Sequence, residues 1–424
     1  MRTVDQALRT ILEHVPGPHQ ADAVRLPLLQ CEGRILAGDL TAGLDLPPFS
    51  RATMDGFAVR SEDLAGEAAS RGLLRVAGES AAGRPSPVPV GTGEAVRIFT
   101  GAQIPTGADA VVMVERTEET DEGVRVLDVP HPGQNIAARG ENLKSTELAL
   151  PAGTWLTPGQ IGLLAGLGRA ELDVLPVPRV AILSTGSELA PPGTALGSGM
   201  IHESNGSMLA ALIRQGGGEP VLLGQVNDDP ELILERSRAG LECDLLLLSG
   251  GSSVGDYDFT PRVLAGLGVE IHFDRVALKP GKPTIFGTGP ARPPHTHRPA
   301  CSVFGLPGNP ISAFVVFHLL VRPALARRAG HERCGPCVLA AELTGEVPRN
   351  ASRDQVLPAV LRAEDGLLKV SFAGWRGSGD LTCLNGVNAL LFVPRGASGL
   401  AEGDAARVLL LEGQEPIGSG AYFE

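Results

Sequence analysis

Four short segments rich in glycine, serine and lysine stand where strands of the predicted fold end. They are residues 184–188 (STGSE), 249–258 (SGGSSVGDYD), 279–283 (KPGKP) and 306–312 (LPGNPIS). Adjacent glycines in the second segment let backbone N–H groups converge on an anion, and its serines add hydrogen-bond donors. Ligands of open α/β sheets bind at the carboxyl ends of the strands, so these segments together predict one anion site at one sheet edge.

Basic residues in the third segment and a helix start in the fourth favour the same prediction. Lys279 and Lys282, with Arg275 just upstream, place positive charge where an oxyanion could bind. The fourth segment ends where a helix is predicted to begin, and a helix N-terminus attracts anions. The third segment is not a Walker A loop, because Pro283 follows Gly281 and Lys282. Taken alone, each segment is also typical of a tight turn or a solvated loop.

Carboxylates on the predicted strand-end loops could hold a metal ion; they are Glu188, Asp228, Asp229, Asp256 and Asp258. Magnesium prefers one or two carboxylates together with the phosphate oxygens of a substrate. We therefore expect a Mg²⁺ ion between Glu188 or Asp258 and a phosphate. Asp228 has a second interpretation, as the cap of the helix that Asp229-Pro230 opens, and both stay open.

The elements that must position these loops alternate between strand and helix from residue 178 to 328. The predicted strands are 178–184, 219–226, 243–250, 269–278, 284–287 and 301–305. The predicted helices are 205–215, with Asn205 as its cap, 230–238, 260–266 and 310–328. Such alternation predicts a doubly wound, mostly parallel α/β sheet. The apolar run 245–248 predicts a strand that is covered on both faces.

The regions on either side of 178–328 have a different pattern of apolar residues and turns, so the chain is predicted to be a multi-domain α/β plus β protein. Residues 3–15 predict an amphipathic helix, in which Thr3 and Gln6 form a capping box. Between about 24 and 175, short apolar runs alternate with Gly/Pro turns, which favours one or two small β domains. From about 335 onward, short strands return and predict a small β-barrel or sandwich.

Composition narrows the class of function. The 424 residues carry a net charge of −12, which repels nucleic acid and anionic membranes, and only 4% are aromatic. The longest apolar run, 311–321, is interrupted by His318 and is shorter than the roughly 18 residues of a membrane span. The N-terminus lacks a signal-peptide pattern, and six cysteines in this length are not a disulfide framework. A cytoplasmic protein is expected.

Beyond these patterns, the chain resembles a known family. STGSEL, SGGSSVGDYDFTPRVL, ALKPGKP and GLPGNPISAFVVF look like the motifs of the molybdopterin molybdenumtransferases, the MoeA and gephyrin E-domain family. Upstream, PPFSRATMDGFAVR and RIFTGAQIPTGADAVVMVE resemble two further family elements, and NIAARGENL, LTPGQIGLLAGLG and GWRGSGDL also fit. The matching segments follow the family's order and cover nearly the whole chain.

The resemblance implies four domains and a homodimer. The domains would be residues 1–45 with 145–176, an inserted β domain at 46–144, the α/β molybdopterin-binding domain at 177–330, and a C-terminal β-barrel at 331–424. The active cleft would be shared between two subunits. The implied reaction takes adenylylated molybdopterin and molybdate, inserts molybdenum at the dithiolene sulfurs and releases AMP, with Mg²⁺ as cofactor. Molybdopterin adenylyltransferase and acceptor molybdoenzymes would be partners.

The resemblance also implies roles for individual residues. The pterin phosphate and adenylate would be held by Thr185, Gly186, Glu188, Gly250, Gly251, Ser252, Ser253 and Gly255, beside Asp228 and Asp258. The Mg²⁺ ligands would be Glu188 and Asp258. Molybdate and phosphate would face Arg275, Lys279, Lys282 and Ser378. Asp55 and Thr100 would reach in from the partner subunit.

Two positions depart from the family pattern, and other functions stay open. Asn142 stands where relatives usually have Asp, and Pro358 lies in a stretch where they often have Arg, for which Arg353 or Arg376 could compensate. The alternatives are a non-catalytic scaffold of the same family and a molybdopterin adenylyltransferase. Molybdate and tungstate are not distinguished.

One pair of cysteines could in principle be a redox pair, part of a linker or part of a metal site. Cys334-Gly335-Pro336-Cys337 has a thioredoxin-type sequence but follows a long helix, so a linker is favoured over a redox pair. The alternative is a zinc site with Cys334, Cys337 and His331, completed by Cys301, His295 or His297.

Overall fold

The computed structural model describes residues 1–65, 72–250, 260–292, 298–347, 353–396, 399–411 and 417–418. It forms two compact units. The first comprises Met1–Leu26, Cys31–Ala37 and Asp173–Glu424, and the second comprises Pro27–Gln30 and Gly38–Leu172. The finer division into four domains stays a prediction.

The first unit is built on a six-stranded sheet with the strand order β16-β13-β17-β21-β20-β18. Its strands are β13 (Arg179–Thr185), β16 (Glu219–Val226), β17 (Leu245–Ser249), β18 (Glu270–Phe273), β20 (Ile285–Thr288) and β21 (Ser302–Leu306). Strands β16, β13, β17 and β21 are mutually parallel, whereas β20 runs antiparallel to both of its neighbours. The prediction of a mostly parallel sheet is thereby confirmed.

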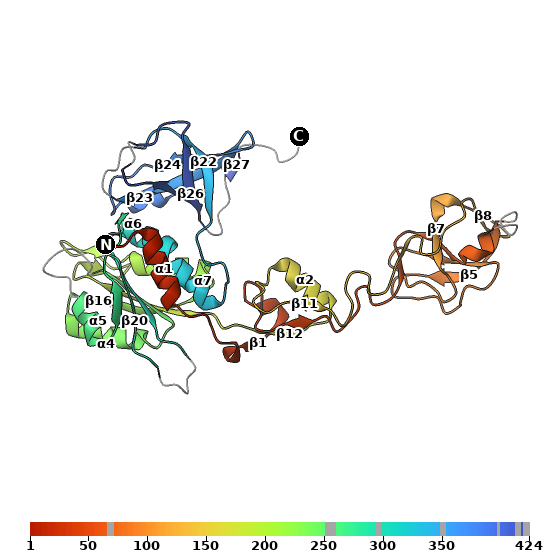
Figure 1. The fold of residues 1–424 in the computed structure, drawn as a ribbon, viewed down its shortest axis with the longest axis horizontal. Coiled ribbons are helices and arrows are strands. Elements are labelled where there is room, and N and C mark those ends of the chain that lie inside the picture. The colour runs from red at the N-terminus through yellow and green to blue at the C-terminus, as the bar shows by residue number, and fades with distance from the viewer. Residues whose placement is uncertain are drawn as a thin grey trace. The chain divides into compact units, whose positions relative to one another are not determined.

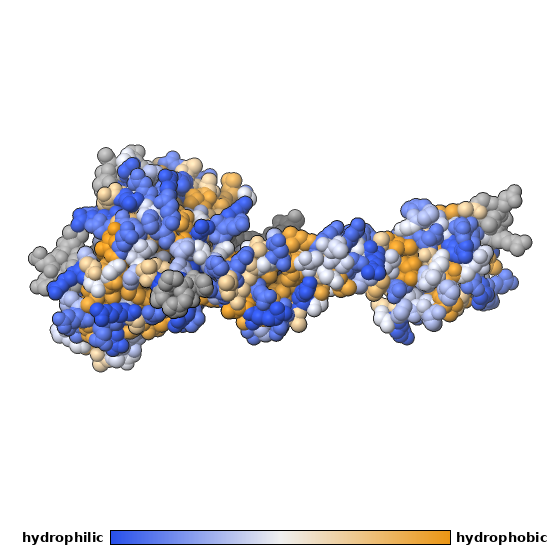
Figure 2. Space-filling model, turned by 60° about the horizontal axis from the view of Figure 1, so that its bottom comes forward, coloured by the Kyte–Doolittle hydropathy of each residue, from blue (hydrophilic) through white to orange (hydrophobic). Residues whose placement is uncertain are grey.

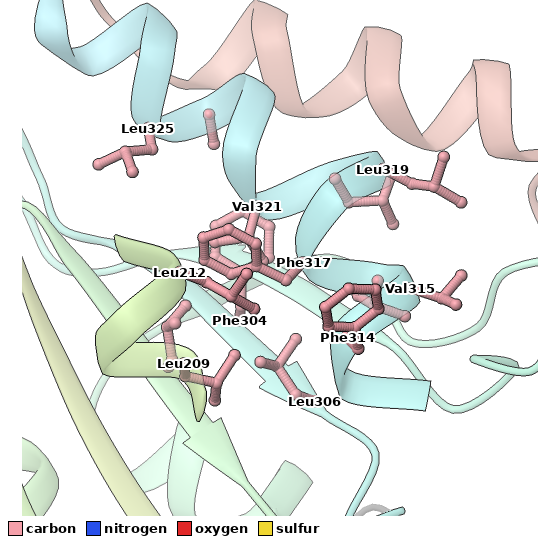
Figure 3. Packing of buried hydrophobic residues seen from close by; sticks show 14 of the residues in the cluster. Leu209, Leu212, Phe304, Leu306, Phe314, Val315, Phe317, Leu319, Val321 and Leu325 are labelled. Carbon is pink, nitrogen blue, oxygen red and sulfur yellow. The ribbon is translucent and has the colours of Figure 1, made fainter. Parts of the chain in front are cut away.

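Helices cover both faces of this sheet, which explains its unbroken apolar strands. In β17, Leu245 and Leu247 join the cluster with α3 (Asn205–Gln215), whereas Leu246 and Leu248 join the cluster with α4 (Pro230–Gly240) and α5 (Thr260–Gly266). Figure 3 shows the first of these clusters, in which α3 residues and β21 residues meet the long helix that follows β21. A small parallel pair, β14 (Leu189–Ala190) with β15 (Ile201–His202), precedes α3.

Helix ends follow the sequence closely, with one correction. Helix α1 (Val4–His14) has the predicted Thr3–Gln6 capping box, and α1 lies along α7 (Arg322–Ala329) in Figure 1. Asp229 caps α4 by accepting from two backbone N–H groups, at 2.9 and 3.3 Å. Asn205 is not the cap of α3: the cap position is Ser204, and the Asn205 side chain bonds elsewhere.

The long helix after β21 is continuous but not uniform. It runs through α6 (Pro310–Val316), a π-helical turn η7 (Phe317–Val321) and α7, and this turn was not predicted. The 20-residue run Pro310–Ala329 is long and apolar enough to cross a membrane, but 78% of its most apolar window is buried inside the protein. It is therefore a core helix, as Figure 3 shows for Phe314, Phe317 and Val321.

The rest of the first unit is a closed five-stranded barrel, as predicted. Its strands are β22 (Val338–Thr344), β23 (Asp354–Glu364), β24 (Leu367–Phe372), β25 (Ala389–Val393) and β26 (Ala405–Leu410). The order β23-β24-β22-β26-β25 closes because β25 pairs with β23. Two short strands, β19 (Leu278–Lys279) and β27 (Ile417–Gly418), add to β23, and η8 (Leu381–Leu384) packs near α6. The predicted strand 269–278 is therefore two strands in two sheets.

The second unit is mostly β, as predicted. Its main sheet has the order β7-β4-β6-β5-β9-β8. These strands are β4 (Gly56–Val59), β5 (Leu73–Ser80), β6 (Glu94–Ile98), β7 (Ala110–Met113), β8 (Thr117–Thr120) and β9 (Gly123–Val126). Shorter pairs join β3 (Arg51–Ala52) to β10 (Ile136–Ala137) and β2 (Leu40–Thr41) to β11 (Leu148–Leu150).

The remaining elements are short. They are β1 (Val24–Pro27), β12 (Glu171–Val174), α2 (Pro158–Gly166), η1 (Gln20–Asp22), η2 (Leu28–Gln30), η3 (Ser61–Leu64) and η5 (Val114–Arg116). Figure 2 shows hydrophilic residues over much of the face in view, with hydrophobic residues scattered among them. Scattered exposed apolar side chains are normal for a protein surface and mark no site by themselves.

Candidate functional site

The carboxyl ends of the parallel strands meet at one edge of the sheet in the first unit. Ser184 in β13 lies opposite Ser249 in β17, Ser249 lies opposite Leu306 in β21, and Thr185 lies opposite Val226 in β16. The loops that follow these four strands therefore leave the sheet side by side. This confirms the predicted convergence of 184–188, the start of 249–258 and 306–312.

The KPGKP segment reaches the same edge by a different route from the one expected. It precedes β20 rather than following a strand, and β20 runs antiparallel, with Ile285 opposite Gly305 near the end of β21. The start of β20 therefore lies at the edge where the parallel strands end. Arg275 follows the carboxyl end of β18 and belongs to this edge as well.

Glycine is required where two of these loops touch. Gly250 has φ of +110°, and a Cβ there would lie 2.1 Å from the Thr185 carbonyl oxygen. A Cβ on Gly308 would lie 3.5 Å from the Cα of Gly250. The loops after β13, β17 and β21 are therefore in backbone contact. Because a glycine has no side chain, its backbone can also approach a ligand closely.

Hydrogen bonds tie the β13 loop to the β16 loop. The Ser187 N–H donates to Asp228 Oδ2, and the Asp228 N–H donates to Ser187 Oγ, both at 3.1 Å. Glu188 folds back, because its Oε2 lies 2.7 Å from the place of a Cβ on Gly186. Asp228 thus stands beside the predicted Glu188 site, and Asp229 rather than Asp228 caps α4.

Two side chains at the start of α3 hold the strand ends together, and the sequence reasoning missed both roles. Glu203 Oε1 accepts from Ser184 Oγ at 3.0 Å and from the Gly206 N–H at 2.6 Å. Asn205 Nδ2 donates to Ser249 Oγ at 2.9 Å and to the Gly308 carbonyl at 2.8 Å. The available signal was the run of polar residues 203–205, which leads into the first turn of this apolar helix.

Hydrogen bonds hold the backbone of the KPGKP segment in place, while neither of its two lysines is paired with a described carboxylate. The Val276 N–H donates to the Lys282 carbonyl at 3.0 Å, and Thr284 Oγ1 donates to the Gly281 carbonyl at 2.7 Å. Among the described residues, no carboxylate forms an ion pair with Lys279 or Lys282. Their charge is therefore available to an anion.

Arg275 and Ser378, the other residues predicted to face molybdate, each have one contact that bears on the site. Arg275 Nε is 3.7 Å from Asp274 Oδ2, and both side chains are exposed, so this pairing is weak. The Ser378 carbonyl accepts from the Ile311 N–H at 3.1 Å, which joins the GSGD loop to the first turn of α6. Arg353 donates to the Leu278 carbonyl at 3.3 Å, one residue before Lys279, and its role as a compensating arginine stays a prediction.

Asp55 and Thr100 form a pair within the second unit. Asp55 Oδ1 accepts from both the Thr100 hydroxyl and the Thr100 N–H, each at 2.7 Å. These bonds, the hydroxyl bond first, lower the pKa of Asp55 below its usual value. No described residue donates to Asp55 Oδ2, so this exposed carboxylate can accept a further hydrogen bond or bind a cation.

Several predicted site residues lie outside the described residues. They are Gly251, Ser252, Ser253, Gly255, Asp256 and Asp258, together with His295 and His297 of the zinc alternative. Within the described ranges, no group of three or more His, Cys, Asp or Glu could hold a metal ion. Of the two predicted Mg²⁺ ligands, Glu188 lies within the described ranges and Asp258 lies outside them, so this prediction stays open.

The cysteine pair sits in a linker, as favoured. Cys334 and Cys337 lie between α7 and β22, no helix begins at Cys334, and both thiols are free. Cys334 Sγ donates to the His331 carbonyl at 2.9 Å. Cys31, Cys243, Cys301 and Cys383 are buried, and none forms a disulfide with another described cysteine. The pair therefore lacks the strand–helix context of a thioredoxin-type site.

Comparison with known proteins identifies the family. Family models match residues 2–168 ("MoeA N-terminal region (domain I and II)"), 181–327 ("Probable molybdopterin binding domain") and 340–411 ("MoeA C-terminal region (domain IV)"). A molybdopterin molybdenumtransferase of Nostoc is 36% identical, covering 97% of this chain and 94% of its own length. The chain belongs to the molybdopterin molybdenumtransferase family. Molybdopterin molybdenumtransferase 2 of Mycobacterium tuberculosis is also 36% identical, over 96% of this chain and 99% of its own length.

Solved structures of this family agree with the fold. The crystal structure of a molybdopterin biosynthesis moea protein from Pyrococcus horikoshii superposes with a TM-score of 0.79 at 33% identity. The match covers 97% of this chain and 99% of the other. Both the α/β sheet and the C-terminal barrel therefore belong to the architecture expected from the family resemblance.

Proposed function

We propose that this protein inserts molybdenum in molybdenum cofactor biosynthesis, converting adenylylated molybdopterin and molybdate to molybdenum cofactor and AMP. The observation that carries this proposal is the meeting, at one sheet edge, of glycine loops and two lysines that pair with no described carboxylate. Gly250 and Gly308 bring two loops into backbone contact there, and Lys279 and Lys282 precede the neighbouring strand β20. Family membership supplies the class of reaction, a transferase step.

The chemistry of the reactants suits this edge. Molybdate and the pyrophosphate link of the adenylylated pterin are both anions, and this chain has a net charge of −12, so binding them needs local positive charge. The ammonium groups of Lys279 and Lys282 supply it, together with backbone N–H groups at the strand ends. Cleavage of a phosphate link depends chiefly on positioning and on stabilising developing negative charge. No nucleophilic triad is needed.

A magnesium ion fits the donors that are present. Glu188 is an exposed carboxylate at the β13 loop, beside the Ser187–Asp228 pair, and both oxygens of a carboxylate are the hard ligands that Mg²⁺ prefers. When bound, Mg²⁺ would neutralise phosphate charge. Asp258 would be the second ligand that the family pattern implies.

We further propose that the protein acts as a homodimer. The support is chemical: Asp55 Oδ2 has no described donor, and Asp55 is an exposed carboxylate of the second unit whose pKa the Thr100 bonds lower. Asp55 and Thr100 of the partner subunit would complete the cleft of the first unit. Molybdopterin adenylyltransferase would supply the substrate, and molybdoenzymes would receive the product.

The test supplies purified protein with adenylylated molybdopterin and Mg²⁺ and follows AMP release against molybdate concentration. The proposal expects AMP release that depends on molybdate. Tight binding of the adenylylated pterin without molybdate-dependent release would contradict insertion and favour a scaffold. Formation of adenylylated pterin from ATP would instead favour an adenylyltransferase.

A further inference from the structure

Asn205 occupies an unusual place for an amide side chain. It is the first residue of α3 and is only 8% exposed. Its Nδ2 donates to Ser249 Oγ at the end of β17 and to the Gly308 carbonyl in the turn after β21. One side chain therefore joins three segments that are 44 and 103 residues apart in sequence.

The orientation of this amide follows from its partners. The Gly308 carbonyl can only accept, so the amide nitrogen must face it. The amide oxygen then points away from Gly308, and it is buried with no hydrogen-bond donor among the described residues. An unpaired buried oxygen is unfavourable, and an apolar side chain of similar size would avoid that penalty. The two hydrogen bonds of Asn205 hold Ser249 and Gly308 at a fixed separation.

The separation of Ser249 and Gly308 matters because Ser249 leads into the glycine loop after β17 and Gly308 lies in the turn after β21, the two loops proposed to face the ligand. Ser249 is followed by Gly250, where a Cβ would lie 2.1 Å from the Thr185 carbonyl oxygen, and a Cβ on Gly308 would lie 3.5 Å from the Gly250 Cα. Glu203 makes the matching link to β13 through Ser184. Backbone N–H groups bind an anion only when the backbone that carries them is held in place.

We propose that Asn205 is a positioning residue of the molybdopterin site, which sets the affinity for the adenylylated pterin by holding the β17 end against the turn that opens α6. The proposal rests on the proposed function. It assigns Asn205 no contact with the ligand. It predicts an effect on the dissociation constant, with little effect on the rate constant at saturating substrate.

The experiment measures binding of adenylylated molybdopterin by its pterin fluorescence, alongside kcat for AMP release. Asn205→Ala removes both of these buried hydrogen bonds, so it should raise Kd about tenfold. It should leave kcat within about twofold of wild type. Ser249→Ala removes one of the two partners and should raise Kd about threefold. The double variant should bind adenylylated molybdopterin with the same Kd as Asn205→Ala, because both substitutions remove the same Asn205–Ser249 hydrogen bond.

The matched control is Asn388→Ala in the barrel. Asn388 is 3% exposed, donates to the Leu361 carbonyl at 2.9 Å and accepts from the Leu361 N–H at 2.7 Å. Its replacement should lower the melting temperature, as Asn205→Ala does, while Kd stays within about twofold of wild type. Thus a change in Kd at Asn205 alone separates positioning from loss of stability.

The outcomes are distinct. Unchanged Kd in Asn205→Ala, or an equal rise in Asn388→Ala, would overturn the role of Asn205 while leaving the proposed function intact. If Asn205→Ala does not fold, Ser249→Ala decides, and an unchanged Kd there overturns the proposal. Failure of the wild-type protein to bind the adenylylated pterin would contradict the proposed function itself.

Discussion

Ser187 and Asp228 bond each other twice, each backbone N–H donating to the other's side chain at 3.1 Å. This reciprocal pair joins the loop after β13 to the loop after β16. It leaves Asp228 Oδ1 without a described donor. Asp228 therefore combines a structural bond through one oxygen with a second oxygen that is free to face a ligand or a cation.

Exchanging Asp228 for Asn or Ala separates these two roles. Asn keeps an oxygen that accepts from Ser187 but removes the charge, whereas Ala removes both. Because the account assigns the charge a role in the site, Asp228→Asn should raise the KM for adenylylated molybdopterin nearly as much as Asp228→Ala, by about tenfold. Full activity in Asp228→Asn together with loss in Asp228→Ala would mean that Asp228 only pins the loops.

Lys279 should be essential through its charge. Lys279→Ala is expected to lower kcat/KM for AMP release about 100-fold, because a positioned cation at developing negative charge contributes about this much. Lys369→Ala is the control: this lysine lies 3.6 Å from Glu364 in the barrel, and its loss should leave activity near wild type. Equal activity of the two variants would remove Lys279 from the site.

Gly250 should tolerate no side chain. A Cβ would lie 2.1 Å from the Thr185 carbonyl, and the residue has φ of +110°. Gly250→Ala should lower the free energy of unfolding by clearly more than the roughly 1–2 kcal/mol of an unfavourable backbone conformation. Gly268→Ala is the control, since Gly268 has φ of +70° but nothing within 4 Å of its Cβ position. Urea unfolding of both variants measures the difference.

Thr100 should hold the pKa of Asp55 below its usual value. Its hydroxyl and its N–H both lower the pKa of Asp55. Thr100→Ala removes the larger of these effects, so the pKa of Asp55, followed by carbon NMR of its carboxyl group, should rise. Thr100→Ser keeps the hydroxyl and should restore the low value. A pKa that is the same in all three proteins would show that the bonds in the structure do not persist in solution.

His318 should make the protein less stable in mild acid. Burial lowers the pKa of His318 to about 3, and its Nε2 has no hydrogen-bond partner among the residues that the structure describes. The folded protein keeps this ring neutral, whereas the unfolded chain takes up a proton below pH 6.5. Stability is therefore lost as the pH falls below 6.5.

Linkage gives the size of this effect. Between pH 7 and pH 5, His318 should lower the free energy of unfolding by about 2 kcal/mol. Leucine has a similar size and suits the contacts with Phe314 and Phe317, so His318→Leu should remove this part of the pH dependence. Denaturant unfolding at both pH values tests it, and identical pH dependence in the variant would contradict the assignment.

Much of the fold could be predicted because its signals are local. The run 245–248 is apolar throughout because helices cover both faces of β17, and Asp229-Pro230 marks a helix start by its own chemistry. The strand-end loops were recognisable because glycine, serine and lysine gather in them. Such signals depend on neighbours within a few residues.

The rest depends on contacts that the sequence pattern does not contain. Asn205 is typical of a helix cap, and only its distant partners Ser249 and Gly308 show that it is a bridge. The reversed direction of β20, which brings KPGKP to the site, is set by pairing with β21 and β18. The π-helical turn at Phe317–Val321 likewise has no marker in the sequence.

The central claim is that this chain couples molybdenum insertion to AMP release. The most direct measurement is a single turnover with bound adenylylated molybdopterin, Mg²⁺ and molybdate, in which AMP and dithiolene-bound molybdenum are both quantified. In the wild-type protein both products should appear together, one to one, and in Lys279→Ala both should disappear. AMP release without molybdenum bound to the dithiolene would contradict it.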